Sequence, residues 1–404
     1  FTKFFLLFLI IKKFFKNYIL NYKGYIGMNI LLNALGIQDS GGITVLDKIS
    51  SELEKSQHNN YIFICNNSTA VIKVLDKYKT RNNMTFHIVE RKGYLYRFYF
   101  ENLICNKIAK DHAIDLIYNL SGTKQFFTNI PQLVKIQNLS YFSKKLDDSY
   151  KSNSQLILWV RQIYLKRLIL KFMLSKSKHI EIQSKHVKNY LLDFIDIREK
   201  SFYVKSDIEV SDGVFLRPKK YDFSKKINFL YIVGPHFELL NKNLLDFTNA
   251  MLELNKNRVD FEINITLTNE QLSNSEVWDV SLNSKTNFLG YISDQEKMKK
   301  LFCDNTILIS TSIIETLGLH VIDGIKNGVI TIVPDEEYAN TVYGEKIFKY
   351  KLFNKDSLLD VIMSVMNYKG PYDEKFLSLQ ENLRQNEVTK FGSILDVFDE
   401  VINV

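Results

Sequence analysis

Short runs of apolar residues recur along the chain, and polar or helix-period segments separate them. The runs predict strands at 30–35, 61–65, 86–89, 115–118, 132–136, 179–184, 202–204, 229–233, 261–266, 286–292, 307–309 and 329–333. Such runs, rich in β-branched residues, are typical of buried parallel strands, and the segments between them predict helices. This alternation of strands and helices predicts an α/β protein with parallel sheets.

The chain is long enough for two such units. It has 404 residues, whereas a typical domain has about 50–250. A charged, irregular stretch at 211–226 contains Gly213 and Pro218 and predicts a linker. We therefore predict two doubly wound, Rossmann-like domains that face each other across a cleft. They lie at 28–210 and 227–380, and a C-terminal helix at 381–404 packs back on the first domain.

The connections between the strands carry further predictions. Residues 36–42 (GIQDSGG) predict a glycine-rich loop before a helix at 43–53, so the backbone at Gly41 and Gly42 can approach a ligand closely. The aromatic segment 94–109 predicts a helix packed in the core, and 335–343 predicts a loop.

Two polar residues, Gln137 and Asn138, follow the strand at 132–136. Ligands of doubly wound folds bind at the carboxyl ends of the strands, so these side chains are candidates for ligand contact. A role of Asn138 in capping the local backbone is the alternative.

The stretch 306–333 contains the most specific pattern. A strand is followed by a short polar turn, Glu315, the tripeptide LGL at 317–319, a short helix that carries Asp323, and a second strand. Gly318 allows a tight turn into the helix. The first amides of the helix lack partners within it and, with the helix dipole, favour an anion such as a diphosphate. The two carboxylates bracket this anion site and can bind hydroxyl groups of a sugar and of a ribose.

The pattern from Glu315 to Asp323, E-x-LGL-x3-D, resembles the E-x7-E motif of the family 4 (group 1) retaining glycosyltransferases, which have the GT-B fold. In that family, Phe stands at the position of Leu317 and a second Glu at the position of Asp323. The segment at 288–302 (FLGYISDQEKMKKLF) is also similar to the family. The resemblance covers nearly all of 28–404.

The resemblance implies a role for each matching residue. Glu315 would orient the transferred sugar, Asp323 would bind the ribose, and Lys242 would bind the donor diphosphate. His236 lies near the position of a family Arg, and a neutral His would stabilise the diphosphate less. The predicted catalytic residues are Glu315, Lys242 and Asn138, and the predicted donor-binding residues are Gly41, Gly42, Gln137, His236, Tyr291, Ile292, Leu317, Gly318, Leu319 and Asp323.

The net charge limits the kinds of partner, and the cysteine content limits the cellular compartment. The net charge of +8 favours anionic partners, namely a nucleoside diphosphate, an anionic membrane surface or nucleic acid. No zinc-finger spacing or RNA-recognition motif supports nucleic acid, and a generally basic solvated surface explains the charge equally well. Cys65, Cys105 and Cys303 are odd in number and far apart, which predicts reduced core residues in a cytoplasmic protein.

Two segments raise the question of membrane contact. Residues 152–178 combine apolar residues at helical spacing with Arg161, Lys166, Arg167 and Lys171. They predict either a core-packing helix with a solvated basic face or a helix that docks on an anionic membrane to reach a lipid-linked acceptor.

Residues 1–27 precede Met28 and contain an apolar run too short to span a bilayer. We interpret them as an extension that is either not native or a membrane-surface helix.

The sequence therefore predicts a glycosyltransferase. It would move a sugar from a nucleoside-diphosphate sugar to a saccharide or lipid-linked saccharide acceptor with retention, without a metal or other cofactor. It would act in the cytoplasm or on the inner face of the plasma membrane. The habit of the family alone points to cell-surface polysaccharide synthesis, such as capsule or lipopolysaccharide. Two alternatives stay open: a non-catalytic protein of the same fold that binds the donor or a partner enzyme, and a nucleotide-sugar epimerase on the same scaffold.

Overall fold

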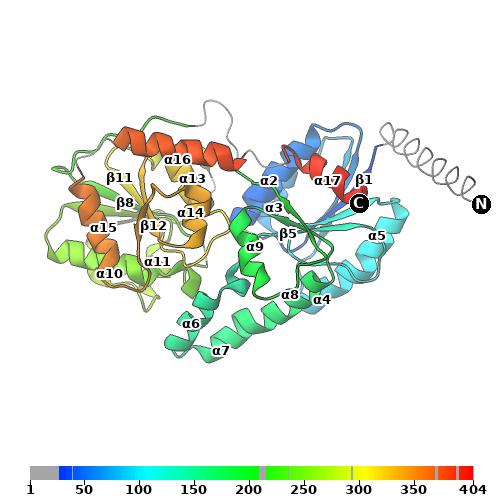
Figure 1. Cartoon of the computed structure of the whole chain (residues 1–404), viewed down its shortest axis with the longest axis horizontal. Helices are drawn as coiled ribbons and strands as arrows, with labels where there is room; N and C mark the ends of the chain where they lie inside the picture. The colour runs from blue at the N-terminus through cyan, green and yellow to red at the C-terminus, as the bar shows by residue number, and fades with distance from the viewer. Residues whose placement is uncertain are drawn as a thin grey trace, which may run out of the picture.

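Two parallel sheets with helices packed around them make up the protein (Figure 1). The computed structural model describes residues 27–38, 40–208, 215–234, 236–292, 294–368, 372–387 and 391–403. The predicted extension at 1–27 lies outside these residues except for Gly27, and so do residues 211–214 of the predicted linker. The two doubly wound sheets confirm the predicted fold class.

The first sheet has seven strands in the order β3-β2-β1-β4-β5-β6-β7. The pairs are parallel, and Leu32 of the central strand lies opposite Phe63 on one side and Tyr118 on the other. Both faces of the sheet are buried, as expected for parallel strands between helical layers. The strands are β1 (Asn29–Ala34), β2 (Asn60–Asn66), β3 (Met84–Val89), β4 (Leu116–Asn119), β5 (Gln132–Ile136), β6 (His179–Ile182) and β7 (Ser201–Val204).

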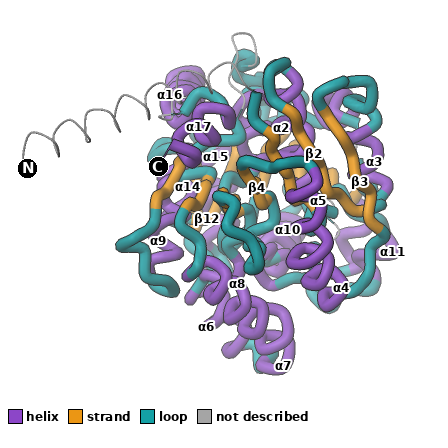
Figure 2. Tube along the Cα trace, turned by 90° about the vertical axis from the view of Figure 1, so that its right-hand side faces the viewer, coloured by secondary structure: helices purple, strands orange, loops and turns teal. Residues whose placement is uncertain are grey.

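The helices of the first domain include two long ones that each contain a π-helical turn, formed by α4, η1 and α5 and by α7, η3 and α8. Figure 2 shows α6 and α7 projecting from the body of the protein. The elements are α2 (Ser40–Glu54), α3 (Thr69–Leu75), α4 (Tyr94–Tyr99), η1 (Phe100–Ile104), α5 (Cys105–Asp111), η2 (Ser140–Phe142), α6 (Lys144–Ser152), α7 (Leu156–Trp159), η3 (Val160–Tyr164), α8 (Leu165–Ser175) and α9 (Lys185–Leu192).

The second sheet has six parallel strands in the order β10-β9-β8-β11-β12-β13. Its strands are β8 (Ile227–Tyr231), β9 (Phe261–Ile265), β10 (Thr286–Phe288), β11 (Thr306–Ile309), β12 (Ile330–Pro334) and β13 (Phe348–Tyr350). The helices that follow β7 in the chain are η4 (Leu240–Lys242), α10 (Leu244–Lys256), α11 (Asn269–Ser273), η5 (Val280–Lys285), α12 (Gln295–Lys300), α13 (Leu319–Lys326), α14 (Glu337–Tyr343), α15 (Ser357–Met366), α16 (Tyr372–Glu387) and α17 (Ile394–Asn403).

Three of the differences from the predicted elements affect the core or the candidate site. Segment 335–343 is not a loop, because α14 forms there and buries Tyr338 and Tyr343 in the core. Helix α2 begins at Ser40, so the two glycines predicted in the preceding loop lie in its first turn. Strand β10 ends at Phe288 rather than at 292, and Gly290, with φ of +64°, then turns the chain away from the sheet.

Two predictions of burial were wrong. The segment 94–109 is not a core helix throughout, because Tyr94 and Leu95 are 78% and 87% exposed. Cys65 and Cys105 are buried free thiols as expected, but Cys303 is exposed. Within the described ranges, no helix has the length and apolar character needed to cross a bilayer.

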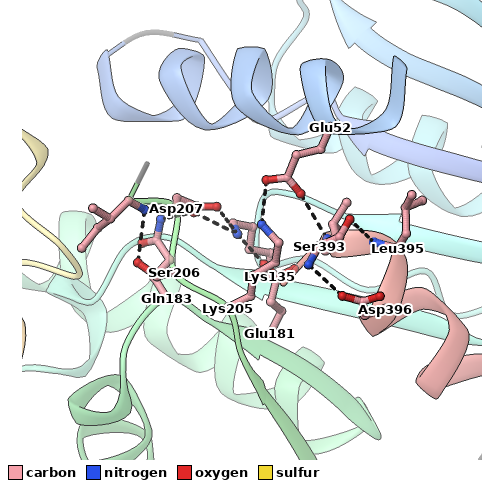
Figure 3. A network of polar contacts seen from close by, with 12 residues as sticks. Glu52, Lys135, Glu181, Gln183, Lys205, Ser206, Asp207, Ser393, Leu395 and Asp396 are labelled. Atoms are coloured by element: carbon pink, nitrogen blue, oxygen red, sulfur yellow. Dashed lines mark hydrogen bonds and ion pairs between the residues drawn. The ribbon is translucent and has the colours of Figure 1, made fainter. Parts of the chain in front are cut away.

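The C-terminal helices pack on different parts of the chain. Helix α16 lies on α13 and α14, whereas α17 lies on α2 and β5 of the first domain. Figure 3 shows polar contacts at this second junction, where Glu52 of α2 accepts a hydrogen bond from Lys205 at 2.9 Å. The same carboxylate accepts a hydrogen bond from the amide of Ile394, at the start of α17, at 3.1 Å. Glu52 thus ties the end of the chain to the first sheet.

Beside this junction, a buried ion cluster crosses the sheet. Nζ of Lys135 on β5 lies 2.5 Å from Glu181 on β6 and 3.0 Å from Asp207, and all three side chains are almost fully buried. Tyr118 on β4 donates to Glu181 at 2.6 Å. Burial disfavours the charged forms, but the opposite charges outweigh it, so the pKa of Lys135 is raised and the pKa of Asp207 is lowered.

We expect Lys135→Met to lower the free energy of unfolding by about 3–5 kcal/mol, because it removes the ammonium group that pairs directly with two buried carboxylates. Unfolding in urea measures this loss. Lys299→Met is the control: it removes an exposed lysine that pairs with Glu296 at 2.8 Å, and we expect a change within about 0.5 kcal/mol. Equal, small effects of the two substitutions would contradict the assigned importance of the buried cluster.

Candidate functional site

The candidate site lies where the carboxyl ends of β8 and β11 meet. These strands are neighbours in the second sheet, and Phe229 lies opposite Ile307. The loops that follow them are in contact, because the amide of Ile313 donates to the carbonyl of Asn241 at 2.8 Å. The carboxyl ends of parallel strands are where doubly wound folds bind ligands.

Lys242 and Glu315 form an ion pair between these two loops. Nζ of Lys242 lies 2.7 Å from Oε1 of Glu315 and 3.5 Å from Oγ of Ser312. The Lys242 carbonyl accepts hydrogen bonds from the hydroxyls of Thr311, at 2.7 Å, and Tyr231, at 3.1 Å. Both the backbone and the charged end of Lys242 are therefore held in place.

Gly318 turns the chain from the second loop into α13. Its φ is +60°, and a Cβ there would lie 2.1 Å from Oη of Tyr343, which donates to the Leu317 carbonyl at 2.8 Å. A side chain at this position is therefore excluded both by the backbone and by the space. Among the residues that the structure describes, none accepts a hydrogen bond from the amides of Leu319 and His320. These N–H groups at the start of α13 are available to an anion.

The site combines a carboxylate, an ammonium group and a neutral imidazole. Burial alone raises the pKa of Glu315, but the charge of Lys242 and hydrogen bonds from Lys242 and Ser312 outweigh it and lower the pKa. Burial lowers the pKa of His320 to about 4, with Glu315 opposing and Lys242 adding to the effect. Nε2 of His320 lies 2.8 Å from Oγ of Ser310. With this low pKa, His320 is neutral at pH 7. Lys242 therefore supplies the positive charge that pairs with Glu315.

The first domain contacts the same loop through His186 on α9. Nε2 of His186 donates to the Glu315 carbonyl at 3.0 Å, and Nδ1 lies 3.1 Å from Oγ of Ser184. Burial lowers the pKa of His186, which favours the neutral ring. Two further contacts join the domains nearby, Asn189 with Glu337 and Lys145 with Glu336. The position of Glu315 therefore depends on both domains.

Helix α2 of the first domain begins opposite the start of α13. A Cβ at Gly41 would lie 3.8 Å from Cδ1 of Leu319, and a Cβ at Gly42 would lie 3.7 Å from Oε1 of Gln137. Nε2 of Gln137 is buried and has no hydrogen-bond partner among the described residues. A buried amide without a partner is costly, so a ligand oxygen that accepted this hydrogen bond would gain affinity.

Asp323 lies one helical turn after Leu319 on α13, so the two side chains share a face of the helix. Because Leu319 approaches Gly41, this face is turned toward the first domain. Asp323 is exposed, and the pKa of its carboxyl is raised because the surrounding protein partly removes it from water. The structure therefore places Glu315 before the helix start and Asp323 one turn beyond it, as the motif requires.

Three other predicted site residues, Asn138, Leu317 and His236, make contacts within the protein. Asn138 accepts a hydrogen bond from the amide of Ser140 at 2.9 Å, which is the capping role that was its alternative. The side chain of Leu317 is buried in the core, so a donor could reach this residue only through its backbone. His236 is exposed, and its carbonyl accepts from the amide of Leu239 at 3.2 Å. None of these contacts tests a role in donor binding.

Tyr291 and Ile292 lie apart from the ion pair. They follow β10, which is three strands from β11 in the second sheet, a separation of about 14 Å at the usual strand spacing. Tyr291 is 63% exposed. A ligand would have to extend along the carboxyl edge of the sheet to contact both this pair and Glu315.

Two hollows in the described part of the chain lie elsewhere. One, of about 350 Å³, opens at the carboxyl ends of β1 to β3 and is lined by Arg91, Lys92, Tyr94 and Arg97 among others. The other, of about 380 Å³, lies beside Lys145 and Glu336, between the domains. We place the candidate site at the ion pair instead, because charged groups and unpaired amides converge there.

The sequence prediction missed Ser312, His320 and His186. Ser312 and His320 lie within the stretch already singled out, and their position on either side of Glu315 was a usable signal. His186 lies 129 residues from Glu315, and only the packing of the domains brings them together. In the described ranges, no three His, Cys, Asp or Glu side chains are grouped as metal ligands would be, and the expectation that transfer needs no metal stays a prediction.

Comparison with known proteins supports the fold. No protein-family model and no curated protein sequence matches the chain. Among solved structures, the chain is similar to a glycosyltransferase from Rickettsia africae, with 15% identity, a TM-score of 0.60, and 94% of this chain and 99% of that chain covered. It is also similar to HepE of Anabaena in complex with UDP and glucose, with 12% identity, a TM-score of 0.60, and coverage of 93% and 98%.

A third similar structure is a TarM variant from S. aureus, in complex with fondaparinux, alpha-GlcNAc-glycerol and UDP. It has 12% identity and a TM-score of 0.61, with 93% of this chain and 100% of that chain covered. At these identities the likeness concerns the fold alone. The chain therefore has the two-domain GT-B arrangement seen in glycosyltransferases.

We expect Gly318→Ala to lower the free energy of unfolding by at least about 1 kcal/mol, because alanine resists the left-handed backbone and its Cβ would clash with Oη of Tyr343. Part of this loss should disappear in the Tyr343→Phe background, where the next atom, Cζ, lies 3.4 Å away. A double-mutant cycle in urea measures the coupling. Additive effects would show that the hydroxyl does not limit this position.

The low pKa of His320 predicts a pH dependence of stability. Between about pH 6.5 and 4 the unfolded chain binds a proton that the folded chain does not, so stability falls as the pH falls. At pH 5 the loss relative to pH 7 is about 2 kcal/mol. His320→Gln should reduce this pH dependence by that amount, as measured by urea unfolding at the two pH values. An unchanged dependence would contradict a buried neutral imidazole.

Proposed function

We propose that the protein transfers a sugar from a nucleoside-diphosphate sugar to a saccharide acceptor, with retention of the anomeric configuration. The observation that carries this proposal is the arrangement at the start of α13, where the amides of Leu319 and His320 have no acceptor among the described residues. Gly318, just before them, lies beside the Lys242–Glu315 ion pair, since a Cβ there would lie 3.6 Å from Cγ of Glu315. Amides and an ammonium group together suit a diphosphate, and the carboxylate beside them suits a sugar hydroxyl.

The proposed chemistry is electrostatic. As the bond from the sugar to the diphosphate breaks, negative charge develops on the leaving oxygen, and the helix start and Lys242 stabilise it. In the absence of donor, Lys242 is paired with Glu315, so a bound diphosphate competes for this ammonium group. Glu315 then accepts hydrogen bonds from the sugar. Asp323, one turn further along α13, accepts hydrogen bonds from the ribose.

The first domain completes the proposed donor site. The start of α2, at Gly41, lies close to Leu319, and the side-chain amide of Gln137, which has no partner among the described residues, can donate to a ligand oxygen. The fold supports the same donor class, since HepE of Anabaena was solved with UDP and glucose and the TarM variant with UDP. Tyr291 and Ile292 are proposed to contact the base of the donor.

The remaining parts of the proposal rest on the resemblance in sequence. They are a saccharide or lipid-linked acceptor, a place in cell-surface polysaccharide synthesis, and no requirement for a metal. Action in the cytoplasm is proposed instead from the few, widely spaced cysteines. We assign no covalent intermediate, because no carboxylate of the described residues is in contact with Glu315.

We expect Glu315→Gln to lower the rate of sugar transfer by about 100-fold or more, because the sugar loses the charged acceptor that orients it. Transfer is measured with the nucleotide-sugar that most raises the melting temperature, since only a ligand that prefers the folded state does so. Glu296→Gln, at an exposed glutamate of α12, is the control and should leave the rate unchanged.

Transfer by Glu315→Gln at the wild-type rate would refute the assigned site. Conversion of the donor without any acceptor would instead favour the epimerase, and donor binding without turnover by the wild type would favour a non-catalytic protein. These two readings are the alternatives that the sequence left open.

A further inference from the structure

Two long helices of the first domain, α4 with η1 and α7 with η3 and α8, turn apolar side chains toward solvent. Leu95 on α4 is 87% exposed and Ile157 on α7 is 85% exposed. Nothing in the described part of the chain covers them. Single exposed apolar side chains are common, but a contiguous group of them marks an interaction surface.

The exposed side chains of the second helix form a stripe. Leu156, Val160, Tyr164, Leu168 and Phe172 recur every four residues, and all are exposed. Such spacing places them on one face of a helix. The helix is attached to the protein by a different face, which buries Ile163, Met173 and Leu174. Among the described residues, none buries this stripe, so the helix combines one face packed on the protein with an apolar face turned toward solvent.

Aromatic rings join the two helices into one surface. The ring of Phe126, in the loop between them, lies 6.3 Å from that of Phe98 on α4 and 5.5 Å from that of Phe172 on α8. The neighbouring Phe127 is 65% exposed. We call the exposed apolar residues of α4, η1, α7, η3 and α8, together with Phe127, the apolar face.

The charge beside the apolar face is positive. From Leu156 to Lys178 the sequence has no acidic residue. Arg161 and Lys171 are exposed among the apolar side chains. At the other end of the face, Tyr94 also lines the hollow that holds Arg91 and Lys92. An apolar stripe with interspersed cations complements an anionic lipid surface, where the rings enter the acyl boundary and the cations meet phosphates.

Arg167 has a different role from its basic neighbours. It is buried and forms a two-pronged ion pair with Asp147, at 2.8 and 2.7 Å. Its guanidinium carbon also lies 4.8 Å from the centre of the Phe194 ring. Arg167 holds the helix on the protein, so it is excluded from any test of the surface.

We infer that the apolar face docks the first domain on the surface of an anionic lipid bilayer. The helices lie in the plane of the interface. This docking does not depend on the proposed sugar transfer, because it uses no residue of the candidate site. It would place the first domain against the membrane and leave the second domain in water.

The test is co-sedimentation of the full chain with vesicles of phosphatidylcholine and phosphatidylglycerol, compared with phosphatidylcholine alone. We expect the wild type to sediment with the anionic vesicles and to be released by added salt. Arg161→Gln with Lys171→Gln should weaken binding about 25-fold, at about fivefold for each cation. Leu168→Ser with Phe172→Ser should also weaken binding while the protein stays folded, as a cooperative melting transition checks, because both side chains are about half exposed.

The matched controls lie on the second domain. Lys299→Gln with Lys300→Gln removes the same charge from exposed positions of α12, and Val280→Ser with Leu377→Ser removes exposed apolar side chains. Both control variants should bind the vesicles like the wild type. The inference is overturned if the folded wild type stays in solution with anionic vesicles, or if the Arg161 and Phe172 variants bind as well as the controls. It is also overturned if the wild type is a dimer that Leu168→Ser with Phe172→Ser dissociates while vesicle binding is absent.

Discussion

The ion pair between Lys242 and Glu315 is the interaction on which the candidate site depends. It joins the loops that follow two neighbouring strands, β8 and β11, and it holds a carboxylate and an ammonium group 2.7 Å apart at the start of α13. The pair satisfies both charges while no ligand is bound, which keeps two partly buried ions stable. An anion that bound both Lys242 and the amides of Leu319 and His320, which no described residue uses, would therefore compete with Glu315 for the ammonium group.

Both domains determine where this pair lies. The carbonyl of Glu315 accepts a hydrogen bond from His186 of the first domain, and the turn at Gly318 is closed by Tyr343 of the second. The start of α2, at Gly41, approaches Leu319 on α13. A movement of one domain against the other would therefore change the site directly. The apolar face lies on the first domain only, so docking there would leave the second domain free to accept the donor.

The sequence was sufficient to predict the strands, the two doubly wound sheets and the stretch around Glu315, because apolar runs and a glycine with a special turn are local signals. It was not sufficient where tertiary packing decides. Helix α14 was missed, although its Tyr338 and Tyr343 hold the loop at Ser312 and Leu317. The first helix of the apolar face was expected to pack in the core, and for the second the sequence left core packing and membrane docking open, since spacing shows that a helix has an apolar side but not which way that side points.

A crystal structure of the chain with the nucleoside diphosphate that it binds most tightly tests the central claim most directly. The account predicts phosphate oxygens within hydrogen-bond distance of the amides of Leu319 and His320 and of Nζ of Lys242, with Asp323 near the ribose. A diphosphate bound elsewhere, for example in the basic hollow beside Arg91, with the Lys242–Glu315 pair undisturbed, would contradict it.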